Sequence, residues 1–191
     1  MPSHADLPTA DEESIRAFLA ACAEQLTARP VEPLPPAAAE GAAAFARAVD
    51  ASTAVPFEPS WLAVLDTIQS VDATPLGHQV AEIAPLLAWE PTFRTDDHGT
   101  EIALAPLNTV RQLEGVTVGL MYLGPGGHYP LHSHPPHELY LTIAGHGRWR
   151  FGGHDDIRTI APGATLYNHP GDLHSATAGD TPLVALYVLW E

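Results

Sequence analysis

Residues 126–145 read Gly-Gly-His-Tyr-Pro-Leu-His-Ser-His-Pro-Pro-His-Glu-Leu-Tyr-Leu-Thr-Ile-Ala-Gly and contain most of a predicted metal site. His132 and His134 are two residues apart, so on an extended strand both side chains leave the same face. Glu138 follows, and Tyr140 lies two residues beyond it and shares its face. Two imidazoles and a carboxylate in one short segment indicate metal binding.

A third imidazole is expected from His174, in the run Pro170-Gly171-Asp172-Leu173-His174, with His169 as its rival. Without a metal, these histidines would be solvated loop residues or a hydrogen-bonded pair in the core. That explanation accounts for each histidine separately, but not for the face that they share. Three imidazoles and a carboxylate therefore predict one divalent transition metal: Zn, Fe, Mn, Co or Ni. A phenol beside that metal, from Tyr140, indicates proton chemistry.

The composition is that of a packed and strongly acidic protein. Of 191 residues, 46% are hydrophobic, and 23 acidic against 8 basic side chains give a net charge of −15. Every basic residue is arginine, which excludes Schiff-base chemistry by lysine. Nucleic-acid binding is not expected, because it needs a basic surface. The acidity could concentrate a cationic substrate, although solubility explains it more simply.

The single cysteine, Cys22, excludes an intrachain disulfide and falls on the apolar stripe of a predicted helix. We therefore expect a buried, inert thiol. The first nine residues carry neither an apolar run nor a basic cluster, and no stretch is long enough to cross a membrane. These observations predict a cytoplasmic protein without a signal peptide or membrane partner.

Residues 1–91 are predicted to form a helical extension that packs on another element. The run Thr9-Ala10-Asp11-Glu12 resembles a helix capping box, and apolar residues follow at helical spacing. The predicted helices run from residue 9 to Pro30, over residues 38–51, from a cap at Ser60 to residue 68, and over residues 75–89. In the last of these, Pro85 predicts a kink or an early stop.

From residue 92 to residue 191 the pattern changes to short apolar runs separated by Gly, Pro, Asp and Asn turns, which is typical of antiparallel strands. The predicted strands cover residues 101–105, 116–123, 128–134, 138–144, 147–151, 156–160, 165–168, 173–178 and 183–189. Many short strands at even spacing favour a barrel or jelly roll, in which two segments can supply ligands to one inward face.

The spacing of the ligand segment resembles the first motif of the cupin superfamily. It reads Gly126, five residues, His132, one residue, His134, three residues, Glu138, six residues, Gly145. The resemblance implies a mostly β fold: a cupin β-barrel (jelly roll) over residues 92–191, with the N-terminal α-helical extension packed on it.

A second cupin motif is partly present. It usually reads Gly, five residues, Pro-x-Gly, two residues, His, whereas here Gly163 is followed by six residues, Pro170-Gly171, two residues and His174. The Gly-x-x-His end is kept, and the Pro-x-Gly is contracted to Pro-Gly. His174 remains the expected fourth ligand.

The longer pattern Tyr129-Pro-x-His-x-His-Pro-x-x-Glu-x-Tyr140 is more restrictive. It resembles the cupin-type dimethylsulfoniopropionate (DMSP) lyases, the DddQ-like group, which also carries an N-terminal helical extension. By motif position, the resemblance implies a metal held by the two histidines and the glutamate of the first motif and by the later histidine, with the tyrosine as a ligand in some states. In this sequence these are His132, His134, Glu138, His174 and Tyr140.

The activity that this resemblance implies is carbon–sulfur bond cleavage by β-elimination. The substrate carboxylate binds the metal, a base removes the Cα proton, dimethyl sulfide leaves from Cβ, and acrylate remains. Tyr140 is the expected base. A free phenol has a pKa of about 10, so Tyr140 would need the positive charge of the metal to ionise near neutral pH. The alternative is that Tyr140 only fills the barrel interior, where its hydroxyl would donate a hydrogen bond to a carboxylate.

Tyr129 and Trp149 are the candidate substrate-binding residues. Trp149 and Trp190 are candidates for the barrel interior, where either could face a sulfonium by cation–π contact. His128 and His137 flank the motif and are expected to be solvated. Three alternatives stay open: a cupin sugar isomerase, a cupin iron dioxygenase, and a metal-binding cupin without turnover. Cupins often pair through strands, so a homodimer is a further expectation.

Overall fold

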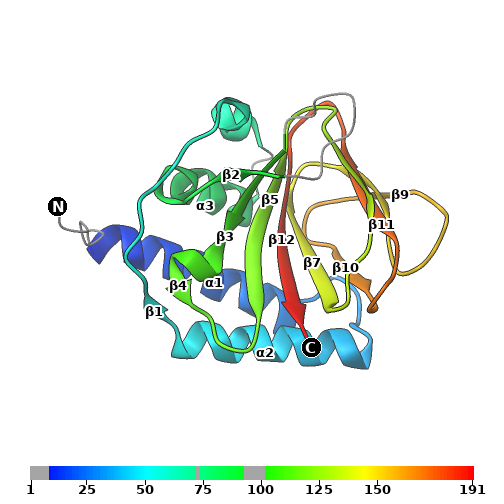
Figure 1. The fold of residues 1–191 in the computed structure, drawn as a ribbon, viewed down its shortest axis with the longest axis horizontal. Helices are drawn as coiled ribbons and strands as arrows, with labels where there is room; N and C mark the ends of the chain where they lie inside the picture. The colour runs from blue at the N-terminus through cyan, green and yellow to red at the C-terminus, as the bar shows by residue number, and fades with distance from the viewer. Residues whose placement is uncertain (1–8, 72–73, 93–101) are drawn as a thin grey trace.

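The strands form a β-barrel of two facing antiparallel sheets, and helices cover the outer face of the larger sheet (Figure 1). The computed structural model describes residues 9–71, 74–92 and 102–191. In these ranges the α-helices are α1 (Thr9–Thr27), α2 (Pro36–Ala51) and α3 (Pro75–Ile83). Short 3-10 turns cover η1 (Ala63–Ser70), η2 (Ala84–Leu86) and η3 (Leu107–Thr109).

Two sheets build the barrel wall, and a two-stranded ribbon lies beside them. The larger sheet has the order β10 (Thr165–Asn168), β7 (His137–Ala144), β12 (Leu183–Trp190), β5 (Thr117–Leu123), β3 (Ile102–Pro106), β2 (Glu90–Pro91). The smaller has the order β6 (His128–His132), β11 (His174–Ala178), β8 (Gly147–Arg150), β9 (Arg158–Ile160). β1 (Thr53–Ala54) pairs with β4 (Arg111–Gln112).

The larger sheet separates two hydrophobic cores, because successive side chains of a strand point to opposite faces. On β12, Leu186 and Val188 belong to the core that the helices cover, whereas Ala185 and Tyr187 belong to the barrel interior. The other central strands, β5 and β7, alternate in the same way. Both faces of this sheet are therefore buried, and its strands are apolar almost throughout.

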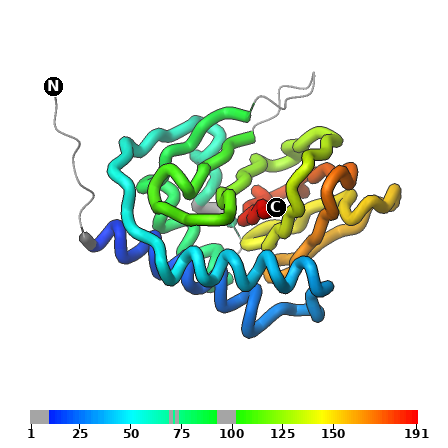
Figure 2. Tube along the Cα trace, turned by 60° about the horizontal axis from the view of Figure 1, so that its bottom comes forward, coloured from blue at the N-terminus to red at the C-terminus, as the bar shows by residue number. Residues whose placement is uncertain are grey.

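The helices cover the outer face through small and apolar side chains. α1 and α2 pack side by side (Figure 2). α2 and α3 both contact β7. Gly41 of α2 lies against the indole of Trp190, so closely that a Cβ there would come within 2.6 Å of three ring atoms. Cys22 is fully buried in this core, and its burial raises the pKa of the thiol, as expected for an inert cysteine.

The helix predictions are confirmed in three places and in part in the fourth, where the 3-10 helix η1 (Ala63–Ser70) overlaps the helix predicted over residues 60–68. The first two helices lie within a few residues of their predicted bounds, and α3 stops at Ile83, just before Pro85. Thr74 caps α3 by accepting a hydrogen bond from the Gly77 amide at 2.9 Å. Ser60 is not a helix cap: it forms a parallel bridge with Ala88, and its hydroxyl donates to the carbonyl of Trp89 at 2.6 Å.

The predicted fold class is confirmed: a mostly β cupin barrel with N-terminal helices. All nine predicted strands overlap an observed strand, although Glu101, where the first was expected to begin, lies outside the described residues. The short strands β1, β2 and β4 were not predicted. Because β2 pairs with β3, residues 90–91 already belong to the larger sheet. The division of the chain at residue 92 stays a prediction.

Candidate metal centre

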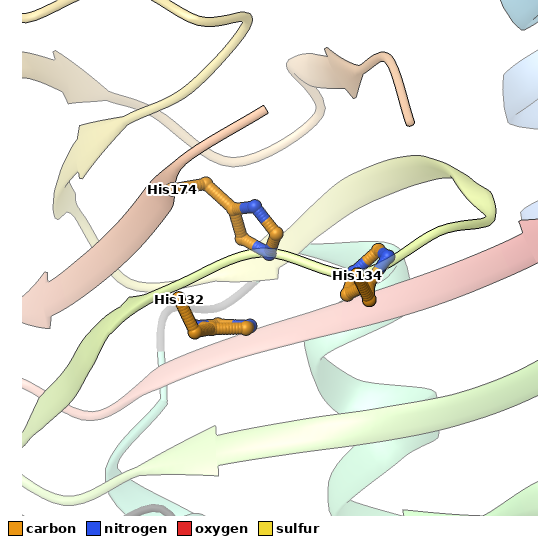
Figure 3. A group of neighbouring side chains, drawn as sticks. All are labelled: His132, His134 and His174. Atoms are coloured by element: carbon orange, nitrogen blue, oxygen red, sulfur yellow. The ribbon is translucent and has the colours of Figure 1, made fainter. Parts of the chain in front are cut away.

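Three histidines from two neighbouring strands and one loop meet inside the barrel (Figure 3). His132 ends β6, His134 lies in the loop that follows, and His174 begins β11, where it pairs directly with His132. One ring nitrogen of each lies within 4.8 Å of the others. The structure thus brings together the two histidines of the His-x-His segment and the later histidine, and His174 rather than His169 completes the group.

Backbone carbonyls fix which nitrogen of each ring faces the centre. The Nδ1 atoms of His132, His134 and His174 lie 2.7, 3.2 and 2.9 Å from the carbonyl oxygens of Pro130, Pro136 and Asp172. A carbonyl can only accept, so each Nδ1 carries the proton and donates it. In the neutral rings, each Nε2 then presents a lone pair, which is how histidine binds a metal.

Glu138 joins this group from β7 across the barrel. Its Oε2 atom lies 3.0 Å from Nε2 of His174 and 3.3 Å from Nε2 of His134. The residue is 3% exposed. Burial alone would raise its pKa, but hydrogen bonds and positive charge from His134 and His174, which need a proton on each Nε2, outweigh burial and hold the pKa of Glu138 at about 2. The side chain is therefore an anion enclosed by the barrel.

Asn168 is a residue of the site that the sequence did not single out. It lies on β10 directly across from Glu138, is 1% exposed, and donates from Nδ2 to Glu138 Oε2 at 3.1 Å. A lone Asn at the end of a predicted strand carries no pattern of its own. Only the pairing of β10 with β7, which is not readable from the sequence, connects it to the motif.

Tyr140 lies on the same face of β7 as Glu138 and is 2% exposed. Its ring centroid is 6.2 Å from that of His174 and 5.0 Å from that of Trp149. Burial raises the pKa of the Tyr140 phenol well above its usual value, and the negative charge of the Glu138 carboxylate raises it further. Without a nearby positive charge, this phenol therefore stays protonated.

A cavity of about 170 Å³ opens beside the histidines. His132, His134, Tyr129, Tyr140 and Tyr187 line it, together with Leu104, Met121 and Leu189. The sequence did not point to Tyr187, whose position on the inner face depends on the register of β12. Burial raises the pKa of Tyr187 above its usual value. Apart from the histidines, the polar groups of this cavity are phenols.

Tyr129 reaches the cavity because the strand pairing is irregular. His132 pairs with His174, but Tyr129 pairs with Ala176, so β6 has one more residue than β11 between the two pairs. This β-bulge places Tyr129 on the side of His132, and their ring centroids lie 4.6 Å apart. Trp149 is almost fully buried against Tyr140 and is not part of the cavity lining.

The remaining histidines of the segment lie away from the centre. Nδ1 of His128 lies 2.8 Å from the Thr177 hydroxyl. The ring of His137 is stacked with Trp190, and its Nδ1 atom lies 2.6 Å from the Tyr167 hydroxyl oxygen. His137 is therefore half-buried rather than solvated. Trp190 does not lie in the barrel interior, because it belongs to the core beneath the helices.

The donor set fits a divalent transition metal. Within the described residues, Nε2 of His174 is buried and has no hydrogen-bond partner, although it lies next to a carboxylate oxygen. Two atoms that both present lone pairs at this distance need a cation or a proton between them. Imidazole nitrogens with a carboxylate oxygen suit Zn, Fe, Mn, Co or Ni, and these ligands do not distinguish between the five metals.

Fold and site together define a cupin with a histidine-rich centre that could hold a metal. The sequence model of the DMSP lyase family matches residues 42–185, and the chain belongs to that family. The dimethylsulfoniopropionate lyase DddQ of Ruegeria pomeroyi is 35% identical over 72 residues. That alignment covers 38% of this chain and 35% of the relative, so the sequence likeness spans about a third of the relative's length.

Solved structures show the same fold over nearly the whole chain. The crystal structure of DMSP lyase DddQ from Ruegeria pomeroyi matches with a TM-score of 0.71 and 19% identity, over 95% of this chain and 91% of that chain. A chain from the crystal structures of the DMSP lyases RdDddP and RnDddQII gives 0.71 and 16%, over 95% and 94%. The barrel alone spans much less than 95% of this chain, so both matches include the helices. Of the helices in the described residues, none has the length and apolar character of a membrane span.

Proposed function

We propose that this protein is a metal-dependent carbon–sulfur lyase that cleaves DMSP to dimethyl sulfide and acrylate. One observation carries the proposal: the histidine group, Glu138 and Tyr140 meet beside one small, tyrosine-lined cavity in a member of the DMSP lyase family. His132, His134, Glu138 and His174 would hold the metal. When bound, the metal would supply a Lewis acid for the substrate carboxylate and a positive charge near the phenol.

Tyr140 is the proposed base. As a phenolate, its oxygen takes the proton from Cα of the substrate, the electrons of that C–H bond form the Cα–Cβ double bond, and the Cβ–S bond breaks. Dimethyl sulfide leaves with the bonding pair, and acrylate remains. Burial and Glu138 raise the pKa of Tyr140, so ionisation depends on the positive charge of the loaded centre.

The cavity suits a small zwitterion. Its volume of about 170 Å³ suits a small substrate, and the aromatic rings of the tyrosines that line it can contact a sulfonium. Tyr129 and Tyr187, which line the cavity with the histidines, are the proposed contacts for the sulfonium end. Trp149, whose ring packs on Tyr140, would act through that tyrosine rather than on the substrate.

Dimethyl sulfide release tests the proposal directly. The purified protein, loaded in turn with Zn²⁺, Fe²⁺, Mn²⁺, Co²⁺ and Ni²⁺, is incubated with DMSP, and the headspace is analysed for dimethyl sulfide. We expect release with at least one metal, and no product with any of them would refute the lyase activity. Turnover with Zn²⁺ or Mn²⁺ under anaerobic conditions would also exclude an oxygen-dependent reaction.

A further inference from the structure

The side-chain amide of Asn168 holds Glu138 by a hydrogen bond, and Glu138 is the carboxylate of the metal centre. Asn168 and Glu138 are direct partners in the pairing of β10 with β7, and both side chains are almost fully buried. Asn168 Nδ2 donates to Oε2 of Glu138, the same oxygen that faces Nε2 of His134 and His174. This donor therefore acts on the very atom that would bind a metal.

The other end of the carboxamide is fixed as well. The amide N–H of Gly152 donates to Oδ1 of Asn168 at 2.8 Å. Rotating the carboxamide by 180° would place its oxygen against the Glu138 carboxylate and its NH₂ against the Gly152 N–H, losing both bonds. One orientation of Asn168 is therefore fixed, and with it the direction in which the donor points.

Such an arrangement orients the carboxylate. Burying a carboxamide costs free energy unless its polar atoms are bonded, and here both are. One N–H from Asn168 uses part of the accepting capacity of Oε2 and leaves the remainder for a cation held between Oε2 and the imidazoles. A carboxylate held in this way loses little rotational freedom when a cation binds, since it is already in place.

We propose that Asn168 is a positioning residue of the metal centre: by holding Glu138 against the histidines, it sets the affinity of the centre for a divalent transition metal. This inference deepens the proposed function and rests on the same ligand set. Asn168 does not line the substrate cavity, and its bond to the metal centre is to Glu138, so its effect on the metal passes through that carboxylate.

Zn²⁺ affinity measures this role. The full chain is stripped of metal, and Zn²⁺ is titrated against a chromogenic chelator for wild type, Asn168→Ala, Glu138→Ala and the double variant. Loss of a partner that orients a metal ligand weakens binding by about 10–100-fold, which is the expected change in Kd for Asn168→Ala. In the Glu138→Ala background, the same substitution should change the Kd by less than about twofold, because nothing is left to orient.

A merely structural role for Asn168 predicts a different result. It would weaken Zn²⁺ binding by the same factor with and without Glu138, and that outcome would overturn the proposal, as would an unchanged Kd for Asn168→Ala. Asn108 provides a matched control, because among the described residues its carboxamide bonds the backbone of Leu113, Val116 and Val118. Asn108→Ala should lower the thermal stability and leave the Zn²⁺ Kd unchanged.

A measurement on the wild-type protein keeps the proposal testable if the Asn168 variants do not fold. In ¹⁵N-labelled protein, the side-chain NH₂ resonances of Asn168 should shift on saturation with Zn²⁺, while those of Asn108 stay in place. Unshifted Asn168 resonances would refute the role. Neither experiment contains DMSP, so tight Zn²⁺ binding without dimethyl sulfide release would refute only the proposed function.

Discussion

Gly119 on β5 should not tolerate alanine, although alanine is usually the better strand residue. It pairs with Tyr187 of β12, whose ring lies across the space where a side chain at residue 119 would be. A Cβ on Gly119 would lie 2.7 Å from Cε1 of Tyr187, with Cζ and the hydroxyl oxygen closer still. All three of these nearest atoms belong to the one tyrosine side chain, so the ring must move.

Two opposing effects set the size of the change. Replacing Gly by Ala within a regular element is worth about 0.5–1 kcal/mol through the reduced entropy of the unfolded chain. Overpacking costs about 1–3 kcal/mol, and the upper part of that range is expected here because three atoms of the Tyr187 side chain lie within 2.7 Å of the new Cβ. The net expectation for Gly119→Ala is a loss of about 1–2 kcal/mol, and at roughly 2–4 °C for each kcal/mol in a chain of this size the Tm falls by about 2–8 °C.

Urea unfolding and thermal melts of Gly119→Ala, Tyr187→Ala and the double variant check this reasoning. In the Tyr187→Ala background the ring is gone, so Gly119→Ala should become neutral or stabilising. The reversal of sign separates a steric clash from a general intolerance of substitution in β5. A Gly119→Ala single variant as stable as wild type would show that the close approach of this ring is not a constraint.

Four further outcomes are expected. Tyr140→Phe should abolish dimethyl sulfide release while metal content stays near wild type, and normal turnover would exclude Tyr140 as the base. His134→Ala should lower the metal content of the purified protein, measured by elemental analysis, as well as the activity. The pKa of Glu138, about 2 against an ordinary 4.5, means that its stabilising contribution is present above about pH 4.5 and is lost as the pH falls toward 2. Urea unfolding across that range should show a smaller acid loss in Glu138→Gln. Gly41→Ala, whose Cβ would meet the indole of Trp190, should lower stability by about 1–3 kcal/mol.

The ligand segment was readable from the sequence because its information is local. His-x-His spacing determines a common face on an extended strand, and the Glu138–Tyr140 spacing does the same on the next strand. His174 needed the second motif in addition, and the family resemblance supplied it. The apolar runs likewise predicted the strands, since each run follows the burial of its own residues.

Residues that reach the site only through the pairing of distant strands could not be predicted from the sequence. Asn168 reaches Glu138 only because β10 pairs with β7 in that register, and Tyr187 faces the cavity only because of the register of β12. The position of Tyr129 depends on an extra residue in β6, which reverses the face that strict alternation predicts. Ser60 resembled a helix cap, yet its hydroxyl bonds to a carbonyl 29 residues away in the chain.

The alternation along β12 has a consequence for how this sequence can change over time. Leu186 and Val188 pack beneath the helices while Ala185 and Tyr187 face the barrel, so one strand carries two interleaved sets of constraints. Deleting a single residue in β12 would turn each following side chain to the opposite face of the sheet. Residues such as Tyr187 would then face the helices, and residues such as Leu186 would face the cavity. Substitutions can therefore accumulate one position at a time in β12, whereas insertions and deletions should be confined to the turns at its ends.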